Sequence, residues 1–240
     1  MQAADRPPPD VEGPTGWVVV LPVKHARHGK RRLLGDLGNL GDLGNLGDFG
    51  HLGKRSGAAR SALARAIATD ALSAARACRL VRSLVVVTSD PVIAELAQSA
   101  GDEVVGGDDQ GLDAAVSVGL ARAALRWPDL GRAVLLADVP ALRPEDLESA
   151  LVAAASYPRS FVPDCEGAGT VLLAARRGVE PRPAFGAGSA ARHERLGAVR
   201  LDLDLPRLRR DVDTAGDLRD AADLGLGPAT RAVLDRSGLA

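Results

Sequence analysis

Residues 83–101, SLVVVTSDPVIAELAQSAG, contain a complete change from strand to helix. The apolar, β-branched run that begins at Ser83 and ends at Asp90 is typical of a buried strand. Pro91 then opens a segment with apolar residues three and four positions apart, which predicts a helix. Because a buried strand that leads directly into a helix is the repeating unit of a parallel sheet, this stretch predicts an α/β fold.

The same alternation extends along the rest of the chain. The apolar run Trp17–Val23 predicts an earlier strand, and a helical pattern begins at Ala58. The later predicted elements are strands at 103–105, 132–137, 160–163 and 170–175, helices that begin at Leu112, Pro144 and Ser189, an extended segment at 198–203, and a final helix capped by Thr214. This alternation predicts a layered α/β fold with a mostly parallel sheet, whose ligands bind beyond the carboxyl ends of the strands.

The chain length of 240 residues suits one principal domain, which we expect to cover residues 17–235. Residues 1–16 are polar and rich in proline, so we expect a disordered tail there. Glycine recurs at every third position from Gly35 to Gly53, without the proline of collagen. So much glycine argues against helix or strand, and it predicts a low-complexity insertion at about 34–56.

Composition argues against several classes of partner. The net charge is −1, which gives no global attraction to nucleic acid or to an anionic membrane. Aromatic residues make up 2% of the chain and offer few stacking platforms for single-stranded nucleic acid. We find no signal-peptide pattern and no run long enough to span a membrane. The two cysteines, Cys78 and Cys165, suggest buried thiols rather than a disulfide scaffold, so we expect a cytoplasmic protein.

A cluster of basic residues follows the first predicted strand in the segment VKHARHGKRRL. Lys24, Lys30 and Arg32 lie in this segment, and only one other lysine, Lys54, occurs in the whole chain. Cations and a glycine in a strand-to-helix loop can cradle a triphosphate, although the Walker A pattern is absent. A solvated basic loop with no ligand remains the alternative.

Three aspartates are candidate ligands for a divalent cation. Asp138 directly follows a predicted strand, and Asp211 and Asp213 alternate in the segment DVDT. Residues two apart in an extended backbone face the same side, so these two carboxylates could converge on one ion. Magnesium binds a few carboxylates together with substrate phosphates, and with the basic loop this set indicates nucleotidyl transfer. The competing role for Asp211 and Asp213 is to cap the helix near Thr214.

Two glycine-rich segments, residues 166–170 and 185–193, form a third cluster. Glycines let backbone amides approach an anion closely, Thr170 adds a hydroxyl, and Ser189 lies at a predicted helix start. Arg192 could add positive charge, and His193 suggests either a surface residue or one that supports the site from behind. An ordinary glycine turn followed by a serine cap is the alternative. No nucleophile is needed, because a phosphate oxygen of the acceptor can attack the α-phosphorus of a triphosphate.

Together these segments resemble the guanylyltransferases of coenzyme F-420 biosynthesis, which use phosphoenolpyruvate or 2-phospho-L-lactate. The resemblance runs from about Val18 to Leu234 and is most specific in RSFVPDCEGAGTVLLAA, PAFGAGSAARHERLGAV and DVDTAGDLRDAADLGLGPAT. It implies a three-layer fold like that of the nucleotide-diphospho-sugar transferases, also called GT-A-like, with a mostly parallel mixed sheet. It also implies transfer of GMP from GTP to the phospho-acid, with release of pyrophosphate.

The resemblance implies roles for individual residues. Asp138, Asp211 and Asp213 are the implied Mg²⁺ ligands. Thr170, Gly186 and Ser189 are the implied acceptor-binding residues, and Lys24, Lys30 and Arg32 are those that meet the nucleotide. Asp113 stands where the family has asparagine, and its side chain is implied to meet the nucleotide as well.

Several alternatives remain open at this point. An actinobacterial-looking composition, together with similarity to the bacterial branch of the family, favours phosphoenolpyruvate as the acceptor, with 2-phospho-L-lactate as the alternative. A molybdopterin-type or sugar-phosphate nucleotidyltransferase usually carries a glycine-rich L-x-G-G-x-S-x-R-M-G loop after the first strand, and this chain does not. A nucleotide-binding regulator without turnover is the alternative from a different class. The implied partners are GTP, the phospho-acid and the downstream deazaflavin-accepting transferase.

Overall fold

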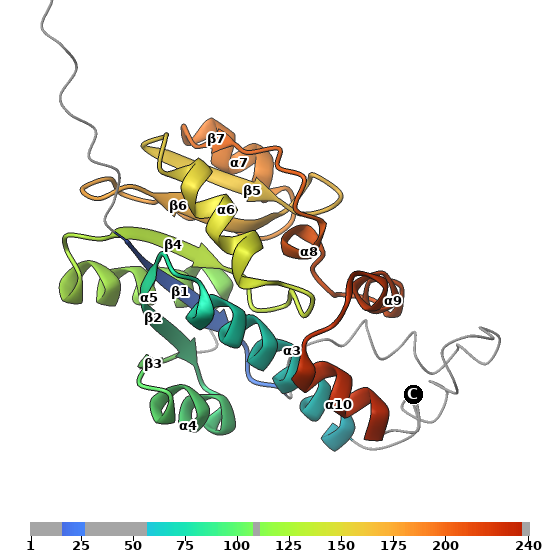
Figure 1. Cartoon of the computed structure of the whole chain (residues 1–240). Helices are drawn as coiled ribbons and strands as arrows, with labels where there is room; N and C mark the ends of the chain where they lie inside the picture. The colour runs from blue at the N-terminus through green and yellow to red at the C-terminus, as the bar shows by residue number, and fades with distance from the viewer. Residues whose placement is uncertain (1–15, 27–56, 108–110, 237–240) are drawn as a thin grey trace, which may run out of the picture.

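The computed structural model of the chain describes residues 16–26, 57–107 and 111–236 (Figure 1). The strands are β1 (Trp17–Val23), β2 (Val81–Thr88), β3 (Glu103–Gly106), β4 (Gly131–Leu135), β5 (Arg159–Pro163), β6 (Thr170–Ala175) and β7 (Val199–Arg200). The helices are α3 (Gly57–Ala77), α4 (Pro91–Ser99), α5 (Leu112–Arg126), α6 (Pro144–Ala154), α7 (Ser189–Arg195), α8 (Pro206–Arg209), α9 (Ala215–Leu224) and α10 (Pro228–Arg236).

The described strands form one seven-stranded sheet in the order β3-β2-β1-β4-β6-β5-β7. Strands β3, β2, β1 and β4 run parallel to one another, and β5 is parallel to β7. Strand β6 is antiparallel to both β4 and β5. The predicted mostly parallel, mixed sheet is therefore confirmed, and β6 alone accounts for its antiparallel pairs.

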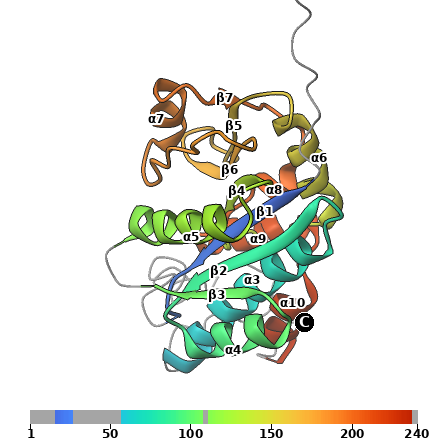
Figure 2. The same ribbon diagram turned by 90° about the vertical axis from the view of Figure 1, so that its left-hand side faces the viewer.

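Helices cover both faces of this sheet and make three layers (Figures 1 and 2). One face packs against α3, α4 and α6 through a continuous apolar core that contains Trp17, Leu72 and Leu151. The other face packs against α5 and α7, with Phe161 and Leu120 among its buried residues. Because β1 lies inside the sheet and is covered on both sides, all seven of its residues are buried. This explains its continuous apolar sequence.

A smaller core joins α3 to the two C-terminal helices, α9 and α10. Asp70 of α3 is buried and accepts hydrogen bonds from the backbone N–H groups of Ala229 and Thr230, at 2.9 and 2.8 Å. These hydrogen bonds hold the first turn of α10 against α3, although about two thirds of the sequence separates the two. The prediction that the Thr214-capped helix is the last one was wrong, because α10 follows it.

Several predicted boundaries also need correction. The predicted strand that begins at Ser83 is β2, which ends at Thr88, and Asp90 is the N-cap of α4. The strand predicted at 132–137 is β4, which spans Gly131–Leu135 and so ends two residues earlier than predicted. Only Val199 and Arg200 form a strand in the predicted extended segment.

Other predictions fall wholly or partly outside the described residues. These are the tail at 1–16 and the glycine-repeat insertion at about 34–56, so the division of the chain into tail, domain and insertion stays a prediction. Within the described part, no helix is both long and apolar enough to cross a bilayer. Cys78 and Cys165 are both free thiols, although Cys165 is only partly buried, which the sequence did not predict.

Candidate active site

The order in which strands are added to the sheet reverses at its centre, between the parallel strands β1 and β4. From β1 the chain builds outward through β2 and β3, and it then returns to add β4 on the other side of β1. In sheets of this kind the ligand site lies at such a point, beyond the carboxyl ends of the strands. Lys24 follows β1 directly and Asp138 lies three residues after the end of β4. The switch point therefore brings a predicted phosphate-binding cation close to a predicted metal ligand.

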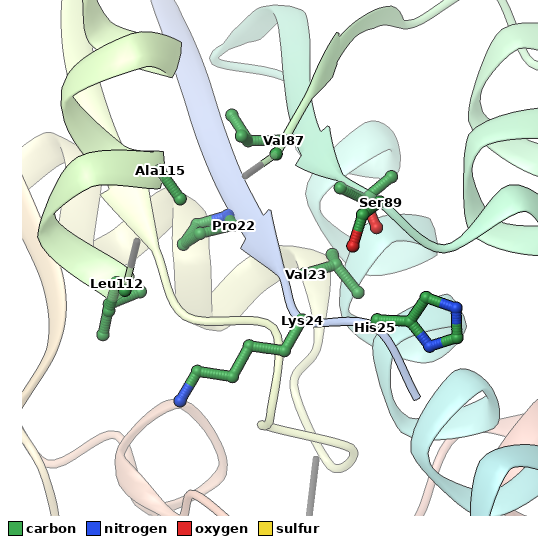
Figure 3. Close-up of a pocket in the computed structure, with 11 residues that line it drawn as sticks. Pro22, Val23, Lys24, His25, Val87, Ser89, Leu112 and Ala115 are labelled. Carbon is green, nitrogen blue, oxygen red and sulfur yellow. The ribbon is translucent and has the colours of Figure 1, made fainter. Parts of the chain in front are cut away.

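Two adjoining cavities flank Lys24 at this edge of the sheet. The larger, of about 290 Å³, extends toward β2 and is lined by His25, Ser89 and Gly107 among others. The smaller, of about 160 Å³, extends toward β4 and is lined by Asp138 and Asp213. Four residues line both cavities: Pro22, Val23, Lys24 and Leu112. In Figure 3 the Lys24 side chain leaves the end of β1 on the Leu112 side, while the His25 ring points the other way.

Asp90 holds the backbone at the start of the basic loop. Its fully buried carboxylate accepts hydrogen bonds from the Ala26 N–H at 3.1 Å and from the Arg65 guanidinium at 3.0 Å. It also caps α4 by accepting from the N–H groups of Val92 and Ile93. Burial favours a higher pKa for Asp90, but these hydrogen bonds outweigh it and lower the pKa below its usual value. Sequence reasoning assigned Asp90 only to the end of a strand.

The backbone brings the three predicted metal ligands to one region. The Val212 N–H donates a hydrogen bond to the carbonyl oxygen of Asp138 at 3.0 Å. Asp211 and Asp213 are the two sequence neighbours of Val212, so this hydrogen bond brings their segment to Asp138. Burial, followed by the negative charges of Asp138, Asp213 and Asp164, raises the pKa of Asp211 to about 7. The carboxylates around Asp211 therefore give this region a negative electrostatic potential.

The helix-capping role considered for Asp211 and Asp213 belongs to other residues. Thr214 is the N-cap of α9, where its hydroxyl accepts a hydrogen bond from the Asp217 N–H at 3.2 Å. The Asp217 carboxylate accepts in turn from the Thr214 N–H at 2.8 Å, which completes a capping box. The carboxylates of Asp211 and Asp213 are thus not used as the cap of this helix.

The chemistry of the donor set fits a hard divalent cation, because carboxylate oxygens are the ligands such ions prefer. A bound cation would also offset the burial and the repulsion that raise the pKa of Asp211. Within residues 16–26, 57–107 and 111–236, however, no three His, Cys, Asp or Glu side chains are grouped closely enough to hold an ion as they stand. The assignment of Asp138, Asp211 and Asp213 as ligands stays a prediction.

The third cluster lies beside β4, on the neighbouring strand. The N–H of Leu136 donates to the carbonyl oxygen of Val171, so the start of antiparallel β6 lies next to the end of β4. Thr170, the first residue of β6, is buried at this edge. The carboxylate of Asp164 shapes the turn ahead of it by accepting from the N–H groups of Ala168 and Gly169, at 2.9 and 2.6 Å.

Residues 184–188, which we call the 184–188 loop, lead into α7 and contain two glycines with positive φ, Gly186 at 101° and Gly188 at 70°. Arg192 braces this loop by donating to three carbonyl oxygens: those of Ala184 at 3.0 Å, Phe185 at 2.6 Å and Ala187 at 2.5 Å. The guanidinium is used inside the protein, which corrects the expectation that Arg192 adds charge for a ligand. Ser189 is the first residue of α7, with Gly188 as the N-cap.

Two further side chains hold the same loop. Asp113, in the first turn of α5, accepts from the Phe185 N–H at 2.8 Å, so it meets the 184–188 loop where the resemblance implied the nucleotide. His193 accepts from the Ala184 N–H at its Nε2 atom, at 3.0 Å. It is fully buried, which excludes the surface position considered for it.

The structure thus brings Lys24, Asp138 and Asp213 together around one cavity, and it places Asp211 beside them. Thr170, Gly186 and Ser189 form a neighbouring group, joined to α5 through Asp113, and line neither cavity. Lys30 and Arg32 lie outside the described residues. Sequence reasoning missed Asp90 and Asp164, which fix backbone amides near the site.

Comparison with known proteins shows the family of the chain. A phosphoenolpyruvate guanylyltransferase of Thermomonospora curvata is 43% identical over 222 residues, which cover 92% of this chain and 89% of that protein. A phosphoenolpyruvate guanylyltransferase of Salinispora arenicola is 45% identical over 217 residues, 89% of this chain and 91% of its own length. The chain belongs to this family. Membership confirms the resemblance found in the sequence and places the chain among the nucleotidyltransferases.

Solved structures support the fold of this phosphoenolpyruvate guanylyltransferase family member. A 4-diphosphocytidyl-2C-methyl-D-erythritol synthase matches with a TM-score of 0.56 and 14% identity, over 88% of this chain and 99% of that one. A Mycobacterium tuberculosis protein, solved as a manganese complex, matches with a TM-score of 0.51 and 19% identity, over 87% and 98%. None of the protein-family models searched matches the chain. At these identities the structural likeness supports the GT-A-like fold and nothing finer.

Proposed function

We propose that this protein transfers GMP from GTP to phosphoenolpyruvate and releases pyrophosphate. A phosphate oxygen of the acceptor attacks the α-phosphorus, the bond from the α-phosphorus to the bridging oxygen breaks, and pyrophosphate leaves with that oxygen. The observation that carries the proposal is the pair of cavities that share Lys24, one open toward β2 and one bordered by aspartates. The names of the relatives support phosphoenolpyruvate as the acceptor.

The larger cavity suits the nucleoside. It is lined mainly by apolar side chains and by backbone at Gly107 and Gly111, and its volume of about 290 Å³ is close to that of small-molecule sites. A nucleoside there places its phosphates at Lys24, on the way to the aspartates. Lys24 then neutralises phosphate charge and aligns the triphosphate with its α-phosphorus toward the smaller cavity.

We propose Mg²⁺ as the cation that Asp138, Asp211 and Asp213 hold. A protein with the same fold was solved as a manganese complex, which supports dependence on a divalent metal. When bound, such an ion neutralises charge that develops on the transferring phosphoryl group. The carboxylates themselves position the ion. The backbone hydrogen bond between Val212 and Asp138 holds the segment of Asp211 and Asp213 next to the segment that follows β4.

The 184–188 loop suits the acceptor. Among the described residues, no acceptor is recorded for the backbone N–H groups of Gly186, Ala187 and Gly188. Arg192 holds three of the loop's carbonyl oxygens, so the loop can present its amides rather than its carbonyls to an anion. With the Thr170 hydroxyl beside β4, these groups would hold the phosphate or carboxylate of phosphoenolpyruvate next to the triphosphate.

Replacement of Lys24 by methionine keeps an unbranched side chain that is one atom shorter and removes its charge. Because Lys24 lies between the two cavities, we expect kcat/KM for GTP to fall at least about tenfold, with a smaller change in KM for phosphoenolpyruvate. Initial rates at varied GTP measure this. K24R is the matched variant, which keeps the charge and should recover part of the loss. Normal GTP kinetics in K24M would remove Lys24 from the nucleotide site.

Asp113 gives a second prediction. Its contact with the Phe185 N–H needs only an oxygen acceptor, so Asp113→Asn should retain activity within about threefold. Asp113→Ala removes the hydrogen bond, and we expect its kcat/KM for phosphoenolpyruvate to fall about fivefold to tenfold. This explains how an acid is accommodated where the family has asparagine. Steady-state kinetics of both variants measure the difference. If D113N were as impaired as D113A, the carboxylate charge would matter and this explanation would fail.

The test of the proposed function is pyrophosphate release with GTP and Mg²⁺, using phosphoenolpyruvate and 2-phospho-L-lactate in separate reactions. We expect turnover with phosphoenolpyruvate. Turnover with 2-phospho-L-lactate alone would move the protein to the other acceptor, and GTP binding without turnover on either acid would favour the non-catalytic alternative. Replacing GTP by ATP, CTP or UTP tests the guanine preference in the same assay.

Some proposals rest on the sequence alone. The place of this reaction in coenzyme F-420 biosynthesis, and contact with a downstream deazaflavin-accepting transferase, come from the resemblance. The cytoplasmic location also stays a prediction.

A further inference from the structure

His193 is surrounded on all sides by the protein. The residue is fully buried in α7, and its ring packs against Phe161, with ring centroids 5.8 Å apart, and edge-on against Phe185, at 5.1 Å. Both ring nitrogens have polar partners. Nδ1 lies 2.9 Å from the Thr170 hydroxyl oxygen, and Nε2 lies 3.0 Å from the backbone nitrogen of Ala184.

These contacts determine which nitrogen carries the proton. A backbone N–H can only donate, so Nε2 must be the unprotonated nitrogen that accepts from Ala184. The proton of the neutral ring is then on Nδ1, which donates to Thr170. Burial, followed by the charge of Arg192, lowers the pKa of His193 to about 4, although Asp113 opposes this shift. The ring is therefore neutral, in one tautomer, throughout the physiological range.

The tautomer in turn orients the hydroxyl of Thr170. Its oxygen accepts from Nδ1, so its own proton must point to a different acceptor. Among the described residues, no other hydrogen-bond partner of this hydroxyl is recorded, although Thr170 is buried at the edge of the site. An ionised phosphate or carboxylate can only accept, so it matches a hydroxyl that can only donate.

We propose that His193 is a positioning residue that makes the Thr170 hydroxyl a dedicated donor to the anionic acceptor and, through its other nitrogen, anchors the 184–188 loop at Ala184. The inference rests on the proposed function, because it takes Thr170 to contact the phospho-acid. His193 touches neither substrate nor nucleotide in this account. The ring links two parts of one subsite, strand β6 and the 184–188 loop, through a single proton position.

A matched pair of variants separates the two nitrogens. The amide nitrogen of H193N can replace the Nδ1 donor to Thr170, whereas the side-chain oxygen of H193Q can replace the Nε2 acceptor for Ala184. Both variants lose ring packing against the two phenylalanines. We expect KM for phosphoenolpyruvate to be about tenfold higher in H193Q than in H193N, with KM for GTP alike in both.

A double-mutant cycle with Thr170→Val tests whether the effect passes through the hydroxyl. In the T170V background the advantage of H193N should be lost, and any remaining difference should favour H193Q, which keeps the acceptor for the Ala184 N–H. Equal KM values for phosphoenolpyruvate in the two single variants, or a KM that stays higher in H193Q than in H193N without the hydroxyl, would overturn the proposal. Thermal melts of all the variants show whether the comparison is made between folded proteins.

The tautomer itself can be measured without turnover. Long-range ¹H–¹⁵N NMR of ¹⁵N-labelled protein distinguishes protonated from unprotonated ring nitrogens, and H193N identifies the signals of this residue. We expect a neutral ring with the proton on Nδ1 that does not titrate between pH 6 and 8. A proton on Nε2, or titration near the ordinary pKa, would overturn the inference even if phosphoenolpyruvate were not the acceptor. Conversely, failure of the turnover assay with the expected NMR result would contradict only the proposed function.

Discussion

Asp138→Ala is expected to lower the rate of pyrophosphate release from GTP and phosphoenolpyruvate more than about a hundredfold, the usual scale for loss of a group that stabilises developing charge. Asp138 follows the end of β4 and lines the smaller cavity together with Lys24 and Asp213. Its backbone carbonyl also holds Val212, between the other two aspartates. Initial rates at saturating substrates measure the loss.

The control for this prediction is Asp138→Asn, which keeps the shape of the side chain but not its charge. We expect D138N to be nearly as inactive as D138A and to need a higher magnesium concentration for its residual activity. Asp129→Ala is a matched variant on the surface, where the carboxylate is exposed and forms an ion pair with Arg177. D129A should behave like the wild type. Near-normal turnover in D138A would remove Asp138 from the metal site.

Asp211→Asn is expected to abolish activity while it stabilises the metal-free protein at pH 8. The pKa of Asp211 rises from 3.8 to about 7 in the folded state, so between these values the folded state binds more protons than the unfolded state. The free energy of unfolding therefore falls as the pH rises from about 4 to 7, and it stays lower above pH 7. A pKa shift of this size lowers the free energy of unfolding by at most about 4 kcal/mol above pH 7.

The asparagine variant removes this penalty because it carries no charge. We expect its melting temperature without metal to exceed that of the wild type by several degrees at pH 8, and by little at pH 4.5. Thermal melts in a chelator at both pH values measure the difference. Added Mg²⁺ should raise the melting temperature of the wild type more than that of D211N. A lower melting temperature for D211N than for the wild type at pH 8 would show that the carboxylate is not under electrostatic strain.

The strands that are covered on both faces were predictable from the sequence. Strands β1 and β6 have the predicted bounds, because continuous apolar runs that end in turn residues have few other interpretations. Helix α10 was missed because its anchor, Asp70, is far away in the chain, and no local pattern reports such a contact. The glycines and proline around residues 225–228 mark the break before α10, but they do not show that a helix follows.

The site was predictable where a charged side chain comes shortly after the end of a strand. Lys24 and Asp138 were found by this rule, and the topology explains why they meet. Asp90, Asp164 and Arg192 were missed or misassigned because they bind backbone groups brought near by folding. One signal was available for Asp90: an aspartate directly before a proline at a strand-to-helix junction is a typical N-cap.

The most direct test of the central claim is ³¹P NMR of the wild-type protein with GTP, Mg²⁺ and phosphoenolpyruvate. The account predicts that one pyrophosphate appears for each phosphoenolpyruvate consumed. A new pair of coupled diphosphate signals should appear with it, from the bond between the acceptor phosphate and the α-phosphate of GMP. Release of inorganic phosphate without those signals, or of pyrophosphate with phosphoenolpyruvate left intact, would contradict GMP transfer to this acceptor.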